Sequence, residues 1–329
     1  MTHTHDLVLV GCDEQGGEAV LELLEARRWK GALKLLDDAA GAGKRLAFAG
    51  RHLVVGDVDA FDFAEARVAL FAGSPEMARR HAPRAAAAGA VAVDVTGAFS
   101  EDDAVPLRVA GVSAGPLPGA GELVAGPAGA AVPLALLLQP LHGAYGVRRV
   151  RATICVPVSE WGSAGVEELA RQTAAMLSGQ PAKSALFPAQ VAFNVQRAAS
   201  VAGVADPEGR LAASLGRLFG EGAPRIDVAM LQVPVFYGFT LQVTVETDPA
   251  CDAAALRGLL AGTSGVELHE EDSPSVVGDA AGSDLVHVGA VRDTGVAGEI
   301  SLWAVADNIR CSRAANGVGI ASLLTADPL

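Results

Sequence analysis

Aromatic residues and long apolar runs are scarce in this sequence. Phe, Trp and Tyr make up 5% of the 329 residues while 50% are hydrophobic, so the core is expected to consist of small aliphatic side chains. No apolar stretch approaches the about 20 residues that a membrane-spanning helix needs. The opening residues, MTHTHDLVLVG, lack the basic segment of a secretory signal. We therefore expect a cytoplasmic protein without a membrane partner.

Positive charge and paired cysteines are also in short supply. The chain has 25 Lys and Arg against 38 Asp and Glu, a net charge of −13. Nucleic acids require clustered Lys and Arg, so the charge disfavours them as partners. The four cysteines are scattered without CxxC spacing: Cys12, Cys155, Cys251 and Cys311. Neither a zinc site nor a disulfide framework is predicted, and no metal is expected.

The first third of the chain alternates between strand and helix patterns. Residues 6–10 predict a buried strand, 11–17 a glycine turn, 18–29 an amphipathic helix and 33–36 a second strand. Such a βαβ unit is typical of a dinucleotide-binding domain. The alternation continues through the strand at 90–95. It predicts a parallel, Rossmann-like sheet in an α/β domain.

The pattern changes after a Gly- and Pro-rich stretch at 112–129, which marks a hinge between domains. Longer, alternating strands are predicted at 147–159, 225–236, 239–247, 283–293 and 299–309, with helices at 165–177 and 252–262. These elements predict an α+β domain with a mostly antiparallel sheet. One face of that sheet needs a cover, and we expect a second subunit to supply it.

The segment 123–146 combines a short apolar run, a turn and a long apolar helix. A helix N-terminus lowers the pKa of a thiol, so an α/β enzyme of this size is expected to place a nucleophilic cysteine here. This chain instead has Gly129, between Ala128 and Ala130. The sulfur atom that would react is therefore missing at this position.

Several segments resemble the aspartate-semialdehyde dehydrogenase family, in the family's order along the chain. They are HAPRAAAAGAVAVDVTGAF at 81–99, VPL at 105–107, QPLHGAYGVRRV at 139–150, FPAQVAFNV at 187–195, VPVFYG at 233–238 and LWAVADNIR at 302–310. The resemblance runs nearly end to end. It implies a Rossmann-like domain over 1–126, an α+β dimerisation domain over 127–309, and a C-terminal helix in 310–329 that packs back on the first domain.

The resemblance also implies which positions carry the chemistry. In the family a cysteine attacks the aldehyde, a glutamine orients the adduct, a histidine handles the proton, and one arginine binds the substrate carboxylate. The corresponding residues are Gly129, Val156, Phe239 and Gln232, and Ser100 stands where a further arginine binds acyl phosphate. Without a nucleophile no thioester forms, so no catalytic residues are expected. The chain resembles the Usg group of the family, whose members lack the catalytic residues.

The cofactor turn also departs from the family's G-x-x-G-x-x-G pattern. Gly11 and Gly17 are present, but Glu14 replaces the central glycine and adds bulk and negative charge where a pyrophosphate approaches. Asp38 and Ala40 replace the family's Ser and Arg for the 2′-phosphate, which disfavours NADP.

NAD binding stays open at this stage. Asp37 or Asp38 offers an acceptor for a ribose hydroxyl, as in NAD-type sites. If the chain binds NAD, the expected cofactor residues are Gly11, Gly17, Asp37, Asp38, Gly73 and Asn308.

The remaining cysteines and histidines are the candidates for a replacement nucleophile. Cys155 precedes Val156, and strand alternation turns it to the opposite face, as for a packed core thiol. Cys311 has no adjacent histidine to activate it. His269 and His287, in an acidic segment and on a strand, show no triad spacing.

Two functions follow as hypotheses. The first is a catalytically degenerate dimeric protein with a binding or regulatory role, either a homodimer or a heterodimer with an active dehydrogenase subunit. The alternative is an oxidoreductase that acts on an aldehyde or acyl phosphate with NAD(P).

Overall fold

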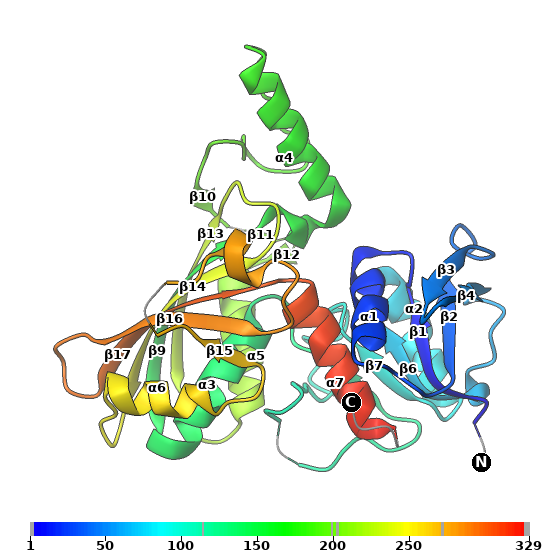
Figure 1. Ribbon diagram of the computed structural model, residues 1–329, viewed down its shortest axis with the longest axis horizontal. Helices are drawn as coiled ribbons and strands as arrows, with labels where there is room; N and C mark the ends of the chain where they lie inside the picture. Colours follow the sequence, from blue (N-terminus) through cyan, green and yellow to red (C-terminus); the bar gives the residue numbers. More distant parts are fainter. Residues whose placement is uncertain (1–2, 114, 199, 202–203, 271–272, 326–329) are drawn as a thin grey trace. The chain divides into compact units, whose positions relative to one another are not determined.

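The computed structural model describes residues 3–113, 115–198, 200–201, 204–270 and 273–325 (Figure 1). The chain forms two compact units. Unit 1 combines Met1–Ala128 with Ile309–Leu329, and unit 2 comprises Gly129–Asn308. Among the described residues, no helix has both the length and the apolar character needed to cross a bilayer.

Unit 1 contains a six-stranded sheet in the order β5-β2-β1-β6-β7-β8, and the neighbouring strands run parallel. The strands are β1 (His5–Val10), β2 (Leu33–Asp37), β5 (Gly56–Asp57), β6 (Ala66–Phe71), β7 (Val91–Asp94) and β8 (Leu123–Ala125). Central strands such as β7 are buried at every position, as expected for a sheet covered on both faces. The predicted parallel, Rossmann-like sheet is confirmed.

Two apolar cores flank this sheet, because alternate residues of β1 point to opposite faces. Leu7 and Leu9 lie in one core with α1 (Gln15–Ala26), α7 (Asn316–Leu324) and the π-helical turn η4 (Arg310–Ala315). Val8 and Val10 lie in the other with α2 (Pro75–Ala87) and the short helix η1 (Phe63–Glu65). A hairpin of β3 (Arg45–Phe48) and β4 (Arg51–Val54) extends beyond the sheet.

Unit 2 contains a seven-stranded sheet in the order β10-β13-β9-β14-β17-β16-β15. The strands are β9 (Val147–Val156), β10 (Gln196–Arg197), β13 (Arg225–Gln232), β14 (Phe239–Thr247), β15 (Val266–Leu268), β16 (Val286–Asp293) and β17 (Glu299–Ala306). Among the described residues, β13 pairs parallel with β9, β15 pairs parallel with β16, and the other neighbours are antiparallel. The predicted mostly antiparallel sheet is confirmed. A separate small hairpin joins β11 (Ser200–Val201) to β12 (Val204–Ala205).

The two faces of this sheet differ in their cover. Helices α3 (Ala131–Tyr145), α5 (Pro207–Phe219) and α6 (Ala253–Ala261) pack on one face, where Ile154, Leu241 and Leu302 are buried (Figure 1). Alternate residues point to the opposite, open face, where Arg151 and Thr153 are exposed. The open face is partly polar, because Arg151 pairs there with Glu299.

Helix α4 (Gly162–Leu177) follows the turn η2 (Val158–Trp161) and projects from the sheet of unit 2 (Figure 1). Buried Glu168 accepts hydrogen bonds from the backbone N–H groups of Ala185 and Leu186. Gln172 accepts from Val191 N at 2.9 Å. These hydrogen bonds hold residues 183–195, a segment without helix or strand, against α4.

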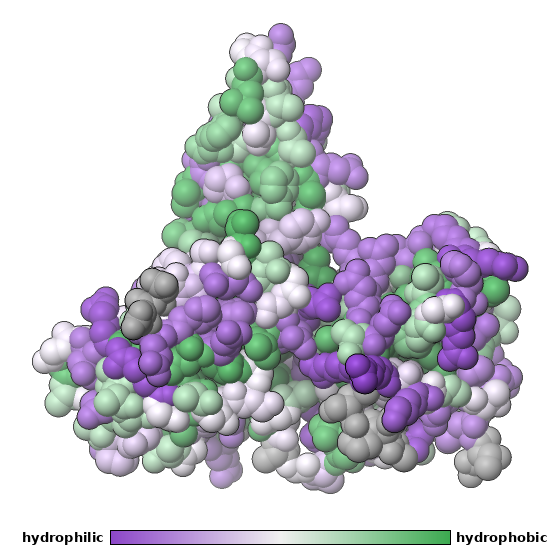
Figure 2. Space-filling model, in the orientation of Figure 1, coloured by the Kyte–Doolittle hydropathy of each residue, from purple (hydrophilic) through white to green (hydrophobic). Residues whose placement is uncertain are grey.

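Hydrophobic side chains gather over α4 and this segment on the surface (Figure 2). Leu177 is 77% exposed, Phe193 62% and Val195 59%. Apolar exposure on this scale is uncommon on a monomer and is typical of a protein interface.

Candidate active site and dinucleotide site

Gly129 lies just before α3, with a left-handed backbone at φ +59°. A Cβ atom built there would lie 3.7 Å from Glu160 Oε2 and 3.9 Å from Phe239 Cζ. The position aligned with the family's nucleophile therefore faces the position aligned with its histidine. Neither residue carries a reactive atom, so a carboxylate and a phenyl ring border the turn.

The other aligned positions cluster at the ends of neighbouring strands. Val156 ends β9 and Gln232 ends β13, and the parallel register pairs the two residues directly. Phe239 begins β14, next to the pair that Thr240 forms with Cys155. All three aligned residues are about 2% exposed. Topology thus brings together the positions that the resemblance singled out, but with core side chains.

Gln232 is the polar member of this cluster. Its Nε2 donates to the backbone oxygens of Val156 at 3.0 Å and Val233 at 3.1 Å. Its Oε1 is buried and has no hydrogen-bond partner among the described residues. Gln232 carries no charge, so it cannot replace the arginine that pairs with a substrate carboxylate.

Asn308 is fully buried just after β17 and is used within unit 2. Its Oδ1 accepts from Gly238 N at 2.9 Å and from Ser159 Oγ at 3.2 Å. Its Nδ2 donates to Glu160 Oε1 at 2.7 Å. Both ends of the Asn308 amide are therefore hydrogen-bonded within the chain, so the residue has a structural role that does not depend on a nicotinamide.

Ser100 belongs to unit 1 and is also buried. Its hydroxyl donates to Gly97 O at 2.9 Å. The same turn is held by Asp94, which accepts from Thr96 N at 2.8 Å and Phe99 N at 3.0 Å. Burial raises the pKa of Asp94 above its ordinary value. A buried hydroxyl beside this acid offers no positive charge to an acyl phosphate.

The glycine turn of unit 1 is closely packed. Gly11 has φ +82°, and a Cβ atom built on it would lie 2.4 Å from Gly73 Cα. A Cβ atom at Gly17 would lie 2.0 Å from Gly11 O. The loops that follow β1 and β6 thus touch through their backbones, and these three positions accept only glycine.

Carboxylates of the chain occupy the backbone donors around this turn. Glu14 Oε1 accepts from Ser74 N at 2.9 Å, at the start of α2. Asp37 Oδ2 accepts from Asp13 N at 2.9 Å, and its Oδ1 accepts from Asp38 N at 2.8 Å. Free N–H groups at such turns are the donors that bind a pyrophosphate. Here the N–H groups of Asp13 and Ser74 already donate to carboxylates of the chain.

The electrostatics of the turn also oppose a diphosphate. Burial raises the pKa of Glu14. Burial, followed by the charge of Asp37, raises the pKa of Cys12 to about 12. Lys44 pairs with Asp13 and offsets part of the negative charge. Bound dinucleotide would bring further negative charge to this cluster, so the residues present do not fit the cofactor's pyrophosphate.

The two candidate ribose acceptors differ in accessibility. Asp37 is buried, and both of its oxygens accept backbone hydrogen bonds. Asp38 is exposed and accepts from Ala40 N at 2.9 Å and Gly41 N at 3.2 Å. Of the pair, only Asp38 presents its carboxylate to solvent.

The cysteines proposed as replacements lie in different units. Cys155 is half-buried on β9, on the face opposite Val156, and burial raises its pKa. Cys311 is buried in η4 of unit 1. A catalytic thiol needs a lowered pKa and access, and Cys155 has the opposite shift.

Comparison with known proteins places these observations in a family. Residues 6–117 match the family model described as semialdehyde dehydrogenase, NAD binding domain. Residues 138–311 match the one described as semialdehyde dehydrogenase, dimerisation domain. The chain belongs to the semialdehyde dehydrogenase family. The resemblance inferred from the sequence motifs is confirmed.

Individual family members cover nearly the whole chain. A USG-1 protein homolog from Azotobacter vinelandii is 40% identical over 333 residues, which cover 98% of each chain. Aspartate-semialdehyde dehydrogenase 2 from Vibrio cholerae is 34% identical and covers 99% of each. The structure of a probable aspartate-semialdehyde dehydrogenase from Pseudomonas aeruginosa superposes with a TM-score of 0.88 at 38% identity, over 97% of each chain. The similarity to Usg-type members is likewise confirmed.

Proposed function

We propose that this chain is a catalytically degenerate member of the semialdehyde dehydrogenase family that acts as a dimeric binding or regulatory protein. One observation carries the proposal: position 129 has no side chain, and the residue facing it is Phe239. Acyl transfer through a thioester needs a thiolate and a group that accepts its proton. Position 129 has no thiol, and Phe239 cannot accept a proton; the Glu160 carboxylate beside the turn has no thiol to act on.

A turnover assay tests this proposal directly. The purified full chain is incubated with aspartate semialdehyde, phosphate and either NAD or NADP, with the Vibrio cholerae enzyme as a positive control. Removing the groups of a catalytic unit can cost about 10⁶-fold in rate, so the assay must detect about that fraction of the control rate. We expect no reduced cofactor above the blank. Turnover proportional to the amount of chain would contradict the proposal.

We infer further that the chain does not use NADP, and that any NAD binding is weak. The internal hydrogen bonds of Glu14 and Asp37 support this inference, since they occupy donors that a pyrophosphate needs. Calorimetric titration with each nucleotide tests it. Glu14→Gly restores the central glycine and should bind NAD more tightly than the unmodified chain.

The alternative function is an oxidoreductase that acts on an aldehyde or acyl phosphate with NAD(P). The family's NAD binding domain and the dehydrogenase activity for which the Vibrio cholerae relative is named favour it. It requires a thiol from elsewhere in the chain, with Cys155 and Cys311 as candidates. Micromolar NAD binding together with turnover that is lost in Cys155→Ser or Cys311→Ser would support this alternative.

For assembly we propose a homodimer. The family's dimerisation domain, the open face of the unit 2 sheet and the apolar surface over α4 support it. A mixed dimer with an active dehydrogenase subunit is the second possibility. Purification of the tagged chain from its native cells distinguishes the two, because only the mixed dimer brings an untagged dehydrogenase in equal amount.

A further inference from the structure

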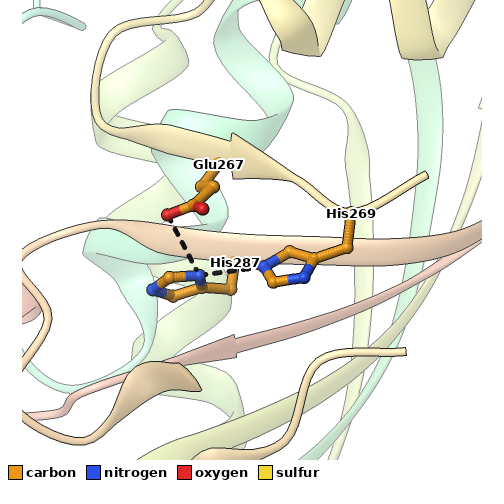
Figure 3. A group of neighbouring side chains, drawn as sticks. All are labelled: Glu267, His269 and His287. Atoms are coloured by element: carbon orange, nitrogen blue, oxygen red, sulfur yellow. Dashed lines mark hydrogen bonds and ion pairs between the residues drawn. The ribbon is translucent and has the colours of Figure 1, made fainter. Parts of the chain in front are cut away.

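Two histidines and a glutamate meet at one edge of the unit 2 sheet (Figure 3). Glu267 lies in β15, His269 directly follows that strand, and His287 lies in β16. The parallel register pairs Glu267 with His287, so their side chains share one face of the sheet. Residues about 20 positions apart in sequence thereby become neighbours.

The donor atoms of Glu267 and His269 both approach Nδ1 of His287, and His269 is hydrogen-bonded to it (Figure 3). His269 Nε2 lies 3.1 Å from His287 Nδ1, and His287 Nδ1 lies 3.5 Å from Glu267 Oε2. All three atoms are within 4.8 Å of one another. Tetrahedral zinc with bonds of about 2.0–2.2 Å separates its ligand atoms by about 3.3–3.6 Å. The donors thus stand close to the spacing that an ion would impose.

A neighbouring hydroxyl holds the second ring nitrogen of the buried histidine. His287 Nε2 lies 2.8 Å from Ser283 Oγ. A proton on Nε2 can be donated to this hydroxyl, which leaves the lone pair of Nδ1 facing His269 and Glu267. Such a second hydrogen bond orients metal-binding histidines in general.

The chemistry of the donors selects the type of ion. Imidazole nitrogen suits zinc and related transition metals, whereas calcium and magnesium prefer all-oxygen sites. Glu267 is exposed, which gives an ion access from solvent.

We propose that Glu267, His269 and His287 bind one divalent zinc-class ion, with water in the fourth position. This differs from the sequence-based expectation of no metal, which rested on the cysteine spacing. The ion would connect β15, a three-residue edge strand, to β16. Ion binding would therefore stabilise this edge of the sheet.

The experiment uses the full chain, stripped with chelator and titrated calorimetrically with zinc chloride. His3 and His5 form a second pair of histidines, so the titration is carried out in a His3→Gln/His5→Gln background. We expect one zinc per chain and a higher Tm in its presence. Glu267→Gln and His269→Gln should each weaken binding by at least about tenfold, and Ser283→Ala by about 10- to 100-fold. His52→Gln, an exposed histidine on β4, is the matched control and should leave binding unchanged.

Cobalt gives an independent readout, because a four-coordinate Co²⁺ site absorbs visible light much more strongly than six-coordinate, water-bound Co²⁺. This spectrum should form in the background protein and be lost in His269→Gln. The partly exposed positions 267 and 269 carry the test, since substitution of buried His287 can unfold the chain. The proposal would be overturned if Glu267→Gln and His269→Gln bound zinc as tightly as the background protein does. So would an absence of binding up to about 100 μM zinc, which excludes a micromolar site.

Discussion

A side chain at residue 129 would begin 3.9 Å from the ring of Phe239. The two positions that the family resemblance assigns to the nucleophile and the histidine are therefore neighbours in this chain. Neither a thiol nor an imidazole is present at these two positions. This relationship can be tested by putting the groups back.

We expect Gly129→Cys/Phe239→His to react with iodoacetamide about 10 times faster at pH 7 than Gly129→Cys alone. An adjacent imidazole lowers the thiol pKa from about 8.5 toward 7 and so raises the thiolate fraction. Alkylation rates measured by mass spectrometry check this. Gly129→Cys/Phe239→Leu is the size control, and its alkylation should be no faster than that of Gly129→Cys alone. Equal rates for the His and Leu variants would show that residues 129 and 239 do not interact.

The native thiols are expected to be poor nucleophiles. With a pKa of about 12, Cys12 is ionised at pH 8 in only about 1 molecule in 10⁴. Cys155 is the one cysteine that is not fully buried. Peptide mapping after brief alkylation at pH 8 should find label on Cys155 at most, and on all four cysteines after unfolding in urea. Rapid labelling of Cys12 or Cys311 in the folded chain would contradict this.

Glu14 should reduce stability at neutral pH. Its pKa in the folded chain is raised above the ordinary 4.5, so the folded state holds the proton more tightly than the unfolded state. The stability that this protonation contributes is present below about pH 4.5 and is lost as pH rises through the folded pKa. Glu14→Gln keeps an acceptor for Ser74 N without the charge.

We therefore expect Glu14→Gln to raise the free energy of unfolding at pH 7. The gain should disappear near pH 4. Urea unfolding at both pH values measures it. Exposed Glu18, in the first turn of the same helix, is the control, and Glu18→Gln should give no gain. A loss of stability in Glu14→Gln at pH 7 would contradict the assignment.

Phe193→Asp should convert the dimer to monomers. Phe193 is 62% exposed within the apolar surface over α4, and a charge there has to be desolvated on association. Asp also tolerates the left-handed backbone, φ +55°, at this residue. Val296→Asp is the control, since Val296 is 61% exposed at the β16–β17 turn. Sedimentation should report a monomer for the first variant and a dimer for the second. If Phe193→Asp remained a dimer, the interface would have to lie elsewhere.

Much of the fold could be predicted because strong periodicity marks the elements. Continuous apolar runs such as residues 6–10 predicted the parallel sheet, and alternation in 239–247 predicted a half-covered one. Helix α5 was not predicted. Its segment has Leu211 and Leu215 at helical spacing, but its two glycines lower its helix propensity. Its first turn is fixed instead by Asp206, which accepts from Gly209 N at 3.1 Å.

The candidate site could be predicted only as far as single positions. Motif spacing identified residue 129 and its aligned partners but not their contacts. The sequence also left Asp37 and Asp38 as equivalent ribose acceptors, and burial at the end of β2 separates them. The cluster around His287 could not be found from spacing, because it depends on the parallel pairing of β15 with β16. The residue pattern of these two strands shows neither that they pair with each other nor in which register.

The contact between Gly11 and Gly73 changes how such a turn can be interpreted. The two backbones approach so closely that any larger residue would force β1 and β6 apart, whether or not a nucleotide is ever present. A chain that had abandoned its coenzyme would still be obliged to retain these glycines in order to fold. Part of a dinucleotide fingerprint can therefore outlast the activity after which it is named.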